Sequence, residues 1–306
     1  MTAALAVIFA GVLHATWNAI AKGATDRLAS FGLIALGQAL LMVPLLPFVG
    51  PPAPAAWPYL ASSVAVHMLY MWLLLKSYEL GDFSQVYPLA RGSAPLLVAA
   101  VAALALNERL SWSQSAGVAA VSGGLVVLAF AGTRRPTATS GRGALRTVSA
   151  GRDGGAVAEG HGSGRDPRAV VAALLTGATI AAYTMLDGIG VREAEGAASY
   201  TVWLFGIEGP ATAAAVWAIR GRDVIAGLDR RQWGLGLTGG VLAMAGYGIV
   251  LWAQTRGALA SVAALRETGV ISGAIIGAVV FSERMGARRI VAACVVAAGV
   301  VLITAH

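Results

Sequence analysis

The residues whose chemistry stands out most clearly are two arginines inside apolar stretches long enough to cross a membrane. Arg91 belongs to the stretch YPLARGSAP at 87–95, where Pro88 and Pro95 flank it. A proline cannot donate the intrahelical hydrogen bond expected at its position, so nearby backbone carbonyls need other partners. An ionisable residue inside a membrane segment is by default a functional-site hypothesis. A guanidinium there would offer a carboxylate, sulfonate or phosphonate a two-pronged set of donors.

The surroundings of Arg91 recur later in the chain. An offset of 175 residues places Arg91 on Arg266 and the stretch NERL at 107–110 on SERM at 282–285. Each copy follows one apolar run and precedes another. The repeat predicts a duplicated chain with the two arginines at matching positions.

Two interpretations of this arginine pair compete. Either the arginines bind an anionic group of a substrate, or each neutralises an internal carboxylate and locks helices together. Glu267 directly follows Arg266, which favours internal pairing there, whereas no carboxylate adjoins Arg91 in sequence. We therefore expect substrate contact at Arg91 in preference to Arg266.

Carboxylates inside the apolar stretches are candidates for carrying protons. Glu208 lies near the middle of one stretch, in FGIEGP at 205–210. A carboxylate at bilayer depth is expected to be protonated or paired, so Glu208 is either a proton-coupling group or the structural partner of an arginine. Asp187 and Glu267 are further candidates, although Asp187 lies near the end of its stretch, where an interfacial position is equally compatible.

Polar and aromatic side chains elsewhere could line a substrate path. His14 and Asn18 lie four residues apart, on one face of a helix, with Trp17 beside them. Hydrogen bonding between helices without function explains them equally well. The remaining candidates for substrate contact are ring-bearing residues within apolar stretches: His67, Tyr70, Tyr87, Tyr183, Trp203 and Tyr247. Ordinary lipid-facing or interfacial packing accounts for any single one of these.

The composition is that of a membrane protein. Hydrophobic residues make up 57% of the chain and charged residues 12%, with a mean hydropathy of +0.72. Soluble domains carry about 25% charged residues. The net charge of +7 comes mostly from short loops, so it does not indicate a nucleic-acid partner.

These stretches predict an all-α polytopic fold, because a spanning helix needs about 20 apolar residues. Ten helices are expected, at 2–21, 30–49, 57–78, 83–106, 112–131, 169–189, 198–219, 233–255, 258–281 and 285–304. Short connections predict that sequential helices are antiparallel neighbours. Glu108 and Glu283 end their apolar runs, where capping, or pairing with the adjacent Arg109 and Arg284, is the simplest account.

A segment rich in Gly, Arg, Ser and Thr divides the chain at 132–168. It has too few large apolar residues to fold, so it is predicted to be a flexible linker between five-helix repeats at 1–131 and 169–306. An odd number of helices per repeat gives the repeats opposite orientations. That is the inverted-repeat plan of secondary transporters, with the substrate site near the midplane.

The basic residues in the loops predict the orientation. Seventeen Lys and Arg fall on one side of the ten-helix arrangement and three on the other, with Arg91 and Arg266 excluded. The positive-inside rule then predicts a cytoplasmic linker and external termini.

The chain resembles the EamA family of the drug/metabolite transporter superfamily. The resemblance rests on the Pro-containing segment that ends in ERL at 108–110, its counterpart with LRE at 265–267 and FSER at 281–284, and the opening HATWNAIAK at 14–22. It implies ten helices in two repeats and transport of small metabolites. Members of this family usually have both termini in the cytoplasm, which is opposite to the orientation that loop charge predicts.

The sequence favours a multi-pass secondary transporter of the inner membrane that works by alternating access. The expected cargo is a small polar, amphipathic or anionic metabolite, such as an amino-acid-like compound, a carboxylate or a phosphonate, and proton-coupled export is the preferred mode. A lipid-handling protein and a facilitative uptake carrier are the alternatives, and a homodimer is left open. The sequence has no nucleotide-binding glycine loop, metal-ligand spacing or HExxH motif, so we expect no enzyme, cofactor or metal.

Overall fold

The regular structure of this protein is helical wherever it is described. The computed structural model describes residues 2–22, 27–81, 83–131, 166–221, 228–280 and 287–305. The helices are α1 (Thr2–Lys22), α2 (Arg27–Met42), α3 (Trp57–Leu80), α4 (Phe83–Ala105), α5 (Trp112–Ala131), α6 (Pro167–Glu193), α7 (Ala197–Arg220), α9 (Arg230–Gln254), α10 (Leu259–Arg266), α11 (Gly269–Val280) and α12 (Ala287–Thr304). Two short 3-10 turns, η1 (Val43–Leu45) and η2 (Pro54–Ala56), precede α3.

Local sequence signals explain several helix ends. The Asp166 side chain accepts a hydrogen bond from the Arg168 amide at the start of α6, with proline at the first helical position. Asp229 and Gln232 form a reciprocal capping box at the start of α9. Gly221 ends α7 with a φ of 78°, a backbone conformation that glycine adopts at no steric cost.

Eight of the described helices are long and apolar enough to cross a membrane. They are α1 to α7 and α9, where the α2 span extends to Leu45, and a shorter apolar helix covers Ile290–Thr304. These helices confirm the prediction of a polytopic all-α membrane protein. The count of ten crossings and the inverted symmetry remain predictions.

The predicted helix at 258–281 is wrong as a single element, because it is two helices, α10 and α11, separated at Glu267 and Thr268. Both residues at this break are buried. The Thr268 hydroxyl donates to the Leu265 carbonyl at 2.8 Å, and the Glu267 carboxylate bonds to a residue of α4. Side-chain bonds of this kind compete with the regular backbone ladder, which apolar content alone does not reveal.

Neighbours in sequence are not the main neighbours in space. The most extensive interfaces join α5 to α12, α3 to α6, α1 to α9, α4 to α6 and α2 to α7. Sequential pairs such as α1 with α2 and α3 with α4 touch little, so the expectation of neighbouring helices is wrong for them, whereas α4 and α5 pack extensively side by side. Helices before the linker instead pack mainly against helices after it.

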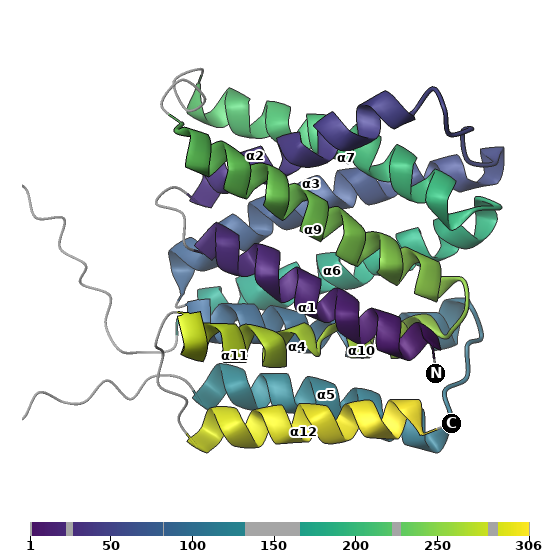
Figure 1. Cartoon of the computed structure of the whole chain (residues 1–306). Coiled ribbons are helices and arrows are strands. Elements are labelled where there is room, and N and C mark those ends of the chain that lie inside the picture. The colour runs from purple at the N-terminus through teal and green to yellow at the C-terminus, as the bar shows by residue number, and fades with distance from the viewer. Residues whose placement is uncertain are drawn as a thin grey trace, which may run out of the picture.

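The helices form one bundle of roughly aligned rods. Figure 1 shows α5 and α12 along one edge, α2 and α7 along the opposite edge, and α1, α4, α10 and α11 between them. Both chain termini lie at the same end of the bundle. Helix α10 is buried throughout, whereas α11 is partly exposed, with Ile275 at 54%.

The α5–α12 interface depends on two glycines. A Cβ atom on Gly117 would lie 2.6 Å from the Gly299 carbonyl oxygen, and one on Gly299 would lie 2.8 Å from the Gly117 oxygen. Gly117→Ala is expected to lower the free energy of unfolding by about 1–3 kcal/mol, because the helices would have to separate. Thermal melts of the purified protein measure this loss.

Gly123→Ala is the matched control on the same helix. No heavy atom lies within 4 Å of the Cβ that this variant would add. Alanine is favoured over glycine inside a helix by about 0.5–1 kcal/mol, so the control should be unchanged or slightly stabilised. Equal losses in the two variants would contradict the close α5–α12 crossing.

Candidate functional site

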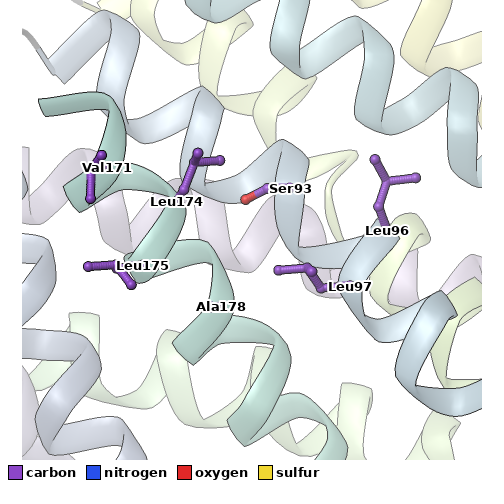
Figure 2. A pocket seen from close by; sticks show the side chains of 7 residues that line it. All are labelled: Ser93, Leu96, Leu97, Val171, Leu174, Leu175 and Ala178. Atoms are coloured by element: carbon purple, nitrogen blue, oxygen red, sulfur yellow. The ribbon is translucent and has the colours of Figure 1, made fainter. Parts of the chain in front are cut away.

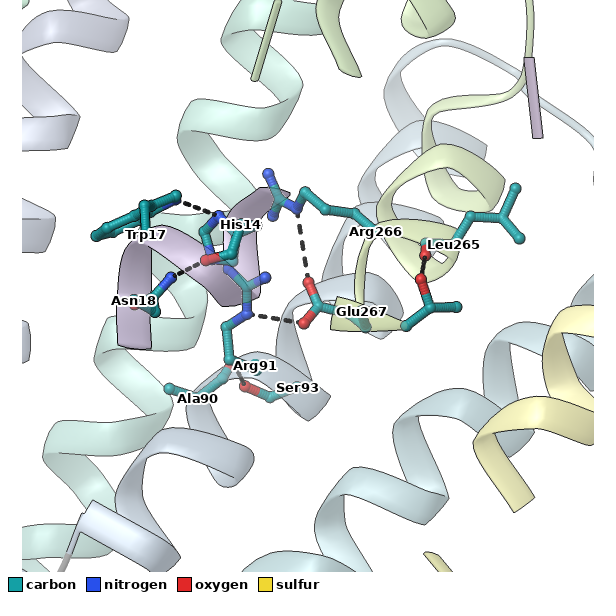
Figure 3. Close-up of polar contacts among 10 residues, drawn as sticks. His14, Trp17, Asn18, Ala90, Arg91, Ser93, Leu265, Arg266 and Glu267 are labelled. Carbon is teal, nitrogen blue, oxygen red and sulfur yellow. Dashed lines mark hydrogen bonds and ion pairs between the residues drawn. The ribbon is translucent and has the colours of Figure 1, made fainter. Parts of the chain in front are cut away.

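The centre of the bundle holds a buried ion pair between α4 and the α10–α11 break. Arg91 is 3% exposed and Glu267 is fully buried. The Arg91 Nε donates to Glu267 Oε2 at 2.7 Å (Figure 3). Both prolines around Arg91 lie inside the continuous helix α4, so each removes one backbone donor without ending the helix. Arg91 is therefore held by a carboxylate 176 residues away in sequence.

Arg266 approaches the same carboxylate from the other side. Its Nε lies 3.6 Å from Glu267 Oε1, which is within ion-pair range but too long for a hydrogen bond. Within the described part of the chain, the Arg266 Nε and the Glu267 Oε1 are buried and have no hydrogen-bond partner. We call Arg91, Arg266 and Glu267 the arginine cluster. It holds two guanidinium groups against one carboxylate.

The expected pairing of the arginines is corrected in part, because Glu267 contacts both of them. Sequence adjacency favoured an internal partner for Arg266 and left Arg91 free, but Glu267 hydrogen-bonds to Arg91. Glu267 lies at the break after α10, where its carboxylate approaches Arg91 of α4 more closely than its neighbour Arg266. The Arg266 Nε is a buried donor that no described residue satisfies.

The predicted group on α1 lies beside the arginine cluster. The Trp17 indole Nε1 donates to His14 Nδ1 at 3.2 Å, and the Asn18 amide donates to the His14 carbonyl at 2.7 Å. Figure 3 shows His14 next to both guanidinium groups, and His14 interacts electrostatically with both arginines. The His14 Nδ1 accepts a hydrogen bond and so carries no proton, which means that a neutral imidazole suits this position between two cations.

Rings from four helices form a layer next to the arginine cluster. We call this layer the aromatic cluster, and it consists of His67, Tyr70, Tyr183, Phe205 and Tyr247. His67 stacks on Tyr183 with ring centroids 4.0 Å apart, and Tyr247 meets both rings edge-on at 6.1 and 6.3 Å. The Arg266 guanidinium carbon lies 5.9 Å from the Tyr183 ring centroid, so the two clusters touch. Four of these residues were expected to contact substrate; Phe205 was not singled out.

A buried carboxylate lies on the far side of the aromatic cluster. Asp187 is fully buried and accepts hydrogen bonds from Tyr200 at 3.0 Å and from Tyr247 at 2.5 Å. Asp187 therefore lies in the protein interior, and its depth in the membrane stays a prediction. Sequence reasoning did not identify Tyr200. The one available signal was that a buried tyrosine hydroxyl usually needs a hydrogen-bond partner.

Glu208 of α7 also presents an unsatisfied oxygen. Its Oε2 is buried without a hydrogen-bond partner among the residues that the structure describes. Glu208 interacts electrostatically with His67 and Asp187, which places it near the aromatic cluster. No arginine neutralises it through a contact of the described chain, and this favours a protonated form over a structural ion pair.

Two other predicted contacts occupy different surroundings. The Arg91 guanidinium carbon lies 5.9 Å from the ring centroid of Tyr87, four residues earlier on the same helix. Trp203 meets Trp57 edge-on at 5.3 Å, and its indole donates to the Val49 carbonyl at 3.3 Å. Tyr87 thus belongs next to the arginine cluster, whereas Trp203 packs near the start of α3.

A separate groove lies on the side of the bundle between α4 and α6. It has a volume of about 480 Å³, and Figure 2 shows the apolar side chains and the single hydroxyl that line it: Ser93, Leu96, Leu97, Val171, Leu174, Leu175 and Ala178. No charged group or ring borders this groove. Its apolar lining suits lipid chains or an apolar ligand, and it is separate from the charged site in the interior.

Comparisons with known proteins agree with this architecture. The model of the EamA-like transporter family matches residues 1–130 and 167–305. No curated protein matches the chain. A solved structure titled "Crystal structure of protein" is 16% identical, covers 99% of this chain and 96% of its own, and superposes with a TM-score of 0.67. That likeness concerns the fold alone.

Proposed function

The chain belongs to the EamA-like transporter family, and on this basis we propose that it moves a small polar, amphipathic or anionic metabolite across the inner membrane by alternating access. The observation that carries the proposal is the arginine cluster. Two buried guanidinium groups converge on one carboxylate, which leaves one positive charge in excess. A carboxylate or phosphonate of the cargo would supply the missing negative charge.

The break between α10 and α11 supports this location of the substrate site. Secondary transporters bind their cargo near the midplane, at discontinuous helices whose ends and unwound backbone face the site. Taken together, α10 and α11 would form one interrupted crossing and, with α12, complete ten. The family model matches 1–130 and 167–305 and so leaves out all but the last two residues of the predicted linker, which supports two five-helix repeats on either side of it.

A ligand screen on purified protein tests the proposal. Carboxylates, phosphonates and amino-acid-like compounds are expected to raise the melting temperature, because a ligand that binds the folded state alone stabilises it by mass action. Neutral compounds of the same size should have a smaller effect. Stabilisation by phospholipids, with none by the anionic compounds, would favour lipid handling instead. The apolar groove of Figure 2 is the feature that supports this alternative.

We further propose that export is coupled to proton entry, with Glu208 as the proton carrier and Asp187 as the next candidate. Glu208→Gln should abolish uphill transport driven by a pH gradient, because the amide mimics the protonated acid permanently. Downhill exchange and folding should persist. Flux in proteoliposomes with and without a pH gradient measures this, and gradient-driven accumulation by Glu208→Gln would contradict the coupling role.

The orientation proposed from loop charge places the linker in the cytoplasm and both termini outside. The linker lies almost entirely outside the described residues, so chemical labelling is the direct test. A single cysteine at Ser149, in a Cys294→Ala background, should resist an impermeant thiol reagent in intact cells and react after lysis. Labelling of intact cells would reverse the orientation.

A further inference from the structure

One guanidinium joins three chain segments at the end of the bundle that carries the termini. Arg192, in the last turn of α6, donates from Nε to the Gln254 carbonyl and from Nη2 to the Gly257 carbonyl, both at 2.9 Å. Its Nη1 donates to Glu108 Oε1 at 2.8 Å. Glu108 follows α4, whereas the two carbonyls belong to the end of α9 and the turn before α10. The simple pairing of Glu108 with Arg109 is therefore replaced by a long-range one.

The second oxygen of Glu108 caps a different helix. Glu108 Oε2 accepts a hydrogen bond from the Leu259 amide at 2.9 Å. Leu259 is the first residue of α10, whose own N-cap residue, Ala258, has no capping side chain. The exposed amides at a helix start carry partial positive charge, so a carboxylate is well suited to this position. Glu108, from the segment after α4, thus supplies the cap that the α10 sequence lacks.

Helix α10 connects this cap to the arginine cluster. All eight of its residues are buried, with Leu259 at one end and Arg266 at the other. Eight helical residues span about 12 Å, so a shift at the capped end moves the other end as well. α10 packs against α4 and α1, which carry Arg91 and His14. The position of Arg266 therefore depends on what holds Leu259.

We propose that Glu108 and Arg192 form an ionic gate at this end of the bundle, and that its opening releases α10 and exposes the arginine cluster to that side of the membrane. The proposal rests on the proposed transport function. Glu108 lies in the first segment matched by the family model, and Arg192, Gly257 and Leu259 lie in the second. The gate thus fastens the two matched segments together, and Glu108 is a positioning residue for Arg266.

Distances between spin labels test the gate without any ligand. In a Cys294→Ala background, labels at Trp112 and Ala198 report on the end that carries the termini, and labels at Glu79 and Arg231 report on the opposite end; all four residues are exposed. Glu108→Gln loses the charge-assisted bond, so the long-distance population at the first pair should rise about tenfold. Arg192→Gln should produce the same shift, and the double variant should add little, because both remove one interaction.

Two further variants separate a gate from a simple structural contact. Arg192→Lys keeps the charge but loses the fork that holds two carbonyls and a carboxylate, so it should open the gate partly while the protein stays folded. The exchanged pair, Glu108→Arg with Arg192→Glu, should fail to restore closure, since an arginine cannot accept a bond from the Leu259 amide. Full restoration by the exchange would contradict the capping role.

The readout also distinguishes this proposal from the proposed function. A shift confined to the Trp112–Ala198 pair supports the gate even if no tested compound is transported. Unchanged distances in Glu108→Gln, Arg192→Gln and Arg192→Lys would overturn it even if transport is demonstrated. Equal shifts at both label pairs would likewise overturn it, because they would indicate general loosening of the bundle.

Discussion

Glu267→Gln is expected to lower the free energy of unfolding by about 3–5 kcal/mol, the largest loss that we predict for any single substitution. The carboxylate is fully buried and contacts two buried guanidinium groups. Glutamine keeps the shape but leaves both positive charges without compensation in a medium of low polarity. Thermal and denaturant unfolding of the purified protein in detergent measure the loss.

Glu79→Gln is the matched control. The Lys76–Glu79 pair has the same N–O distance as the Arg91–Glu267 pair, 2.7 Å, but its side chains are 48% and 63% exposed. Exposed ion pairs contribute about 0–1 kcal/mol, so this variant should melt close to the unmodified protein. Similar melting temperatures for Glu267→Gln and Glu79→Gln would show that the interior carboxylate does not hold the two arginines.

Arg266→Lys is expected to weaken substrate binding roughly ten- to hundredfold with little effect on folding. Its guanidinium has a buried, unsatisfied Nε, so hydrogen-bonding capacity is available for a ligand. Lysine keeps the charge but loses the planar fork. Arg91→Lys should instead reduce stability, because the Arg91 Nε already bonds to Glu267.

Ligand affinity and melting temperature, measured on both variants, separate these two roles. Arg231→Lys, at an exposed position near the start of α9, should change neither quantity. A larger loss of affinity in Arg91→Lys than in Arg266→Lys would contradict the assignment of the anion-binding residue.

The membrane class and the family were predictable from sequence, because apolar runs and short motifs are local signals; the functional role of the two arginines stays a prediction. The pairing within the arginine cluster was not predictable. Adjacency in sequence suggested an Arg266–Glu267 pair, and the two are within ion-pair range, but the hydrogen bond of the carboxylate goes to Arg91 of α4. The same holds for Asp187, whose two tyrosine partners come from two other helices at no recognisable spacing.

Glycine patterns were informative where two backbones meet. Glycines recur every four residues in the stretch GVISGAIIG at 269–277, a spacing typical of close helix crossings, and a Cβ atom on Gly269 would lie 2.8 Å from the Gly11 carbonyl oxygen. Gly273, the next glycine of this stretch, has room for a side chain, with its nearest neighbour at 3.9 Å. The break at Glu267 and Thr268 left no trace in the hydropathy pattern, because it depends on a partner on α4.

Packing between helices was the least predictable level. Short loops suggested that α1 would pack against α2, yet α1 lies mainly against α9 and α11. A loop fixes only the distance between helix ends, whereas the extent of packing depends on complementary surfaces along the helices. In this protein the complementary surfaces lie mostly on helices from opposite sides of the linker. A single sequence does not show which helix surfaces are complementary.

The central claim is that this transporter recognises a negative charge on its cargo at the arginine cluster. Uptake of an anionic compound identified by the thermal screen, measured in proteoliposomes against its neutral amide, tests this claim most directly. We predict saturable uptake of the acid, weak uptake of the amide, and loss of the difference in Arg266→Lys. Equal uptake of acid and amide by the unmodified protein would contradict it.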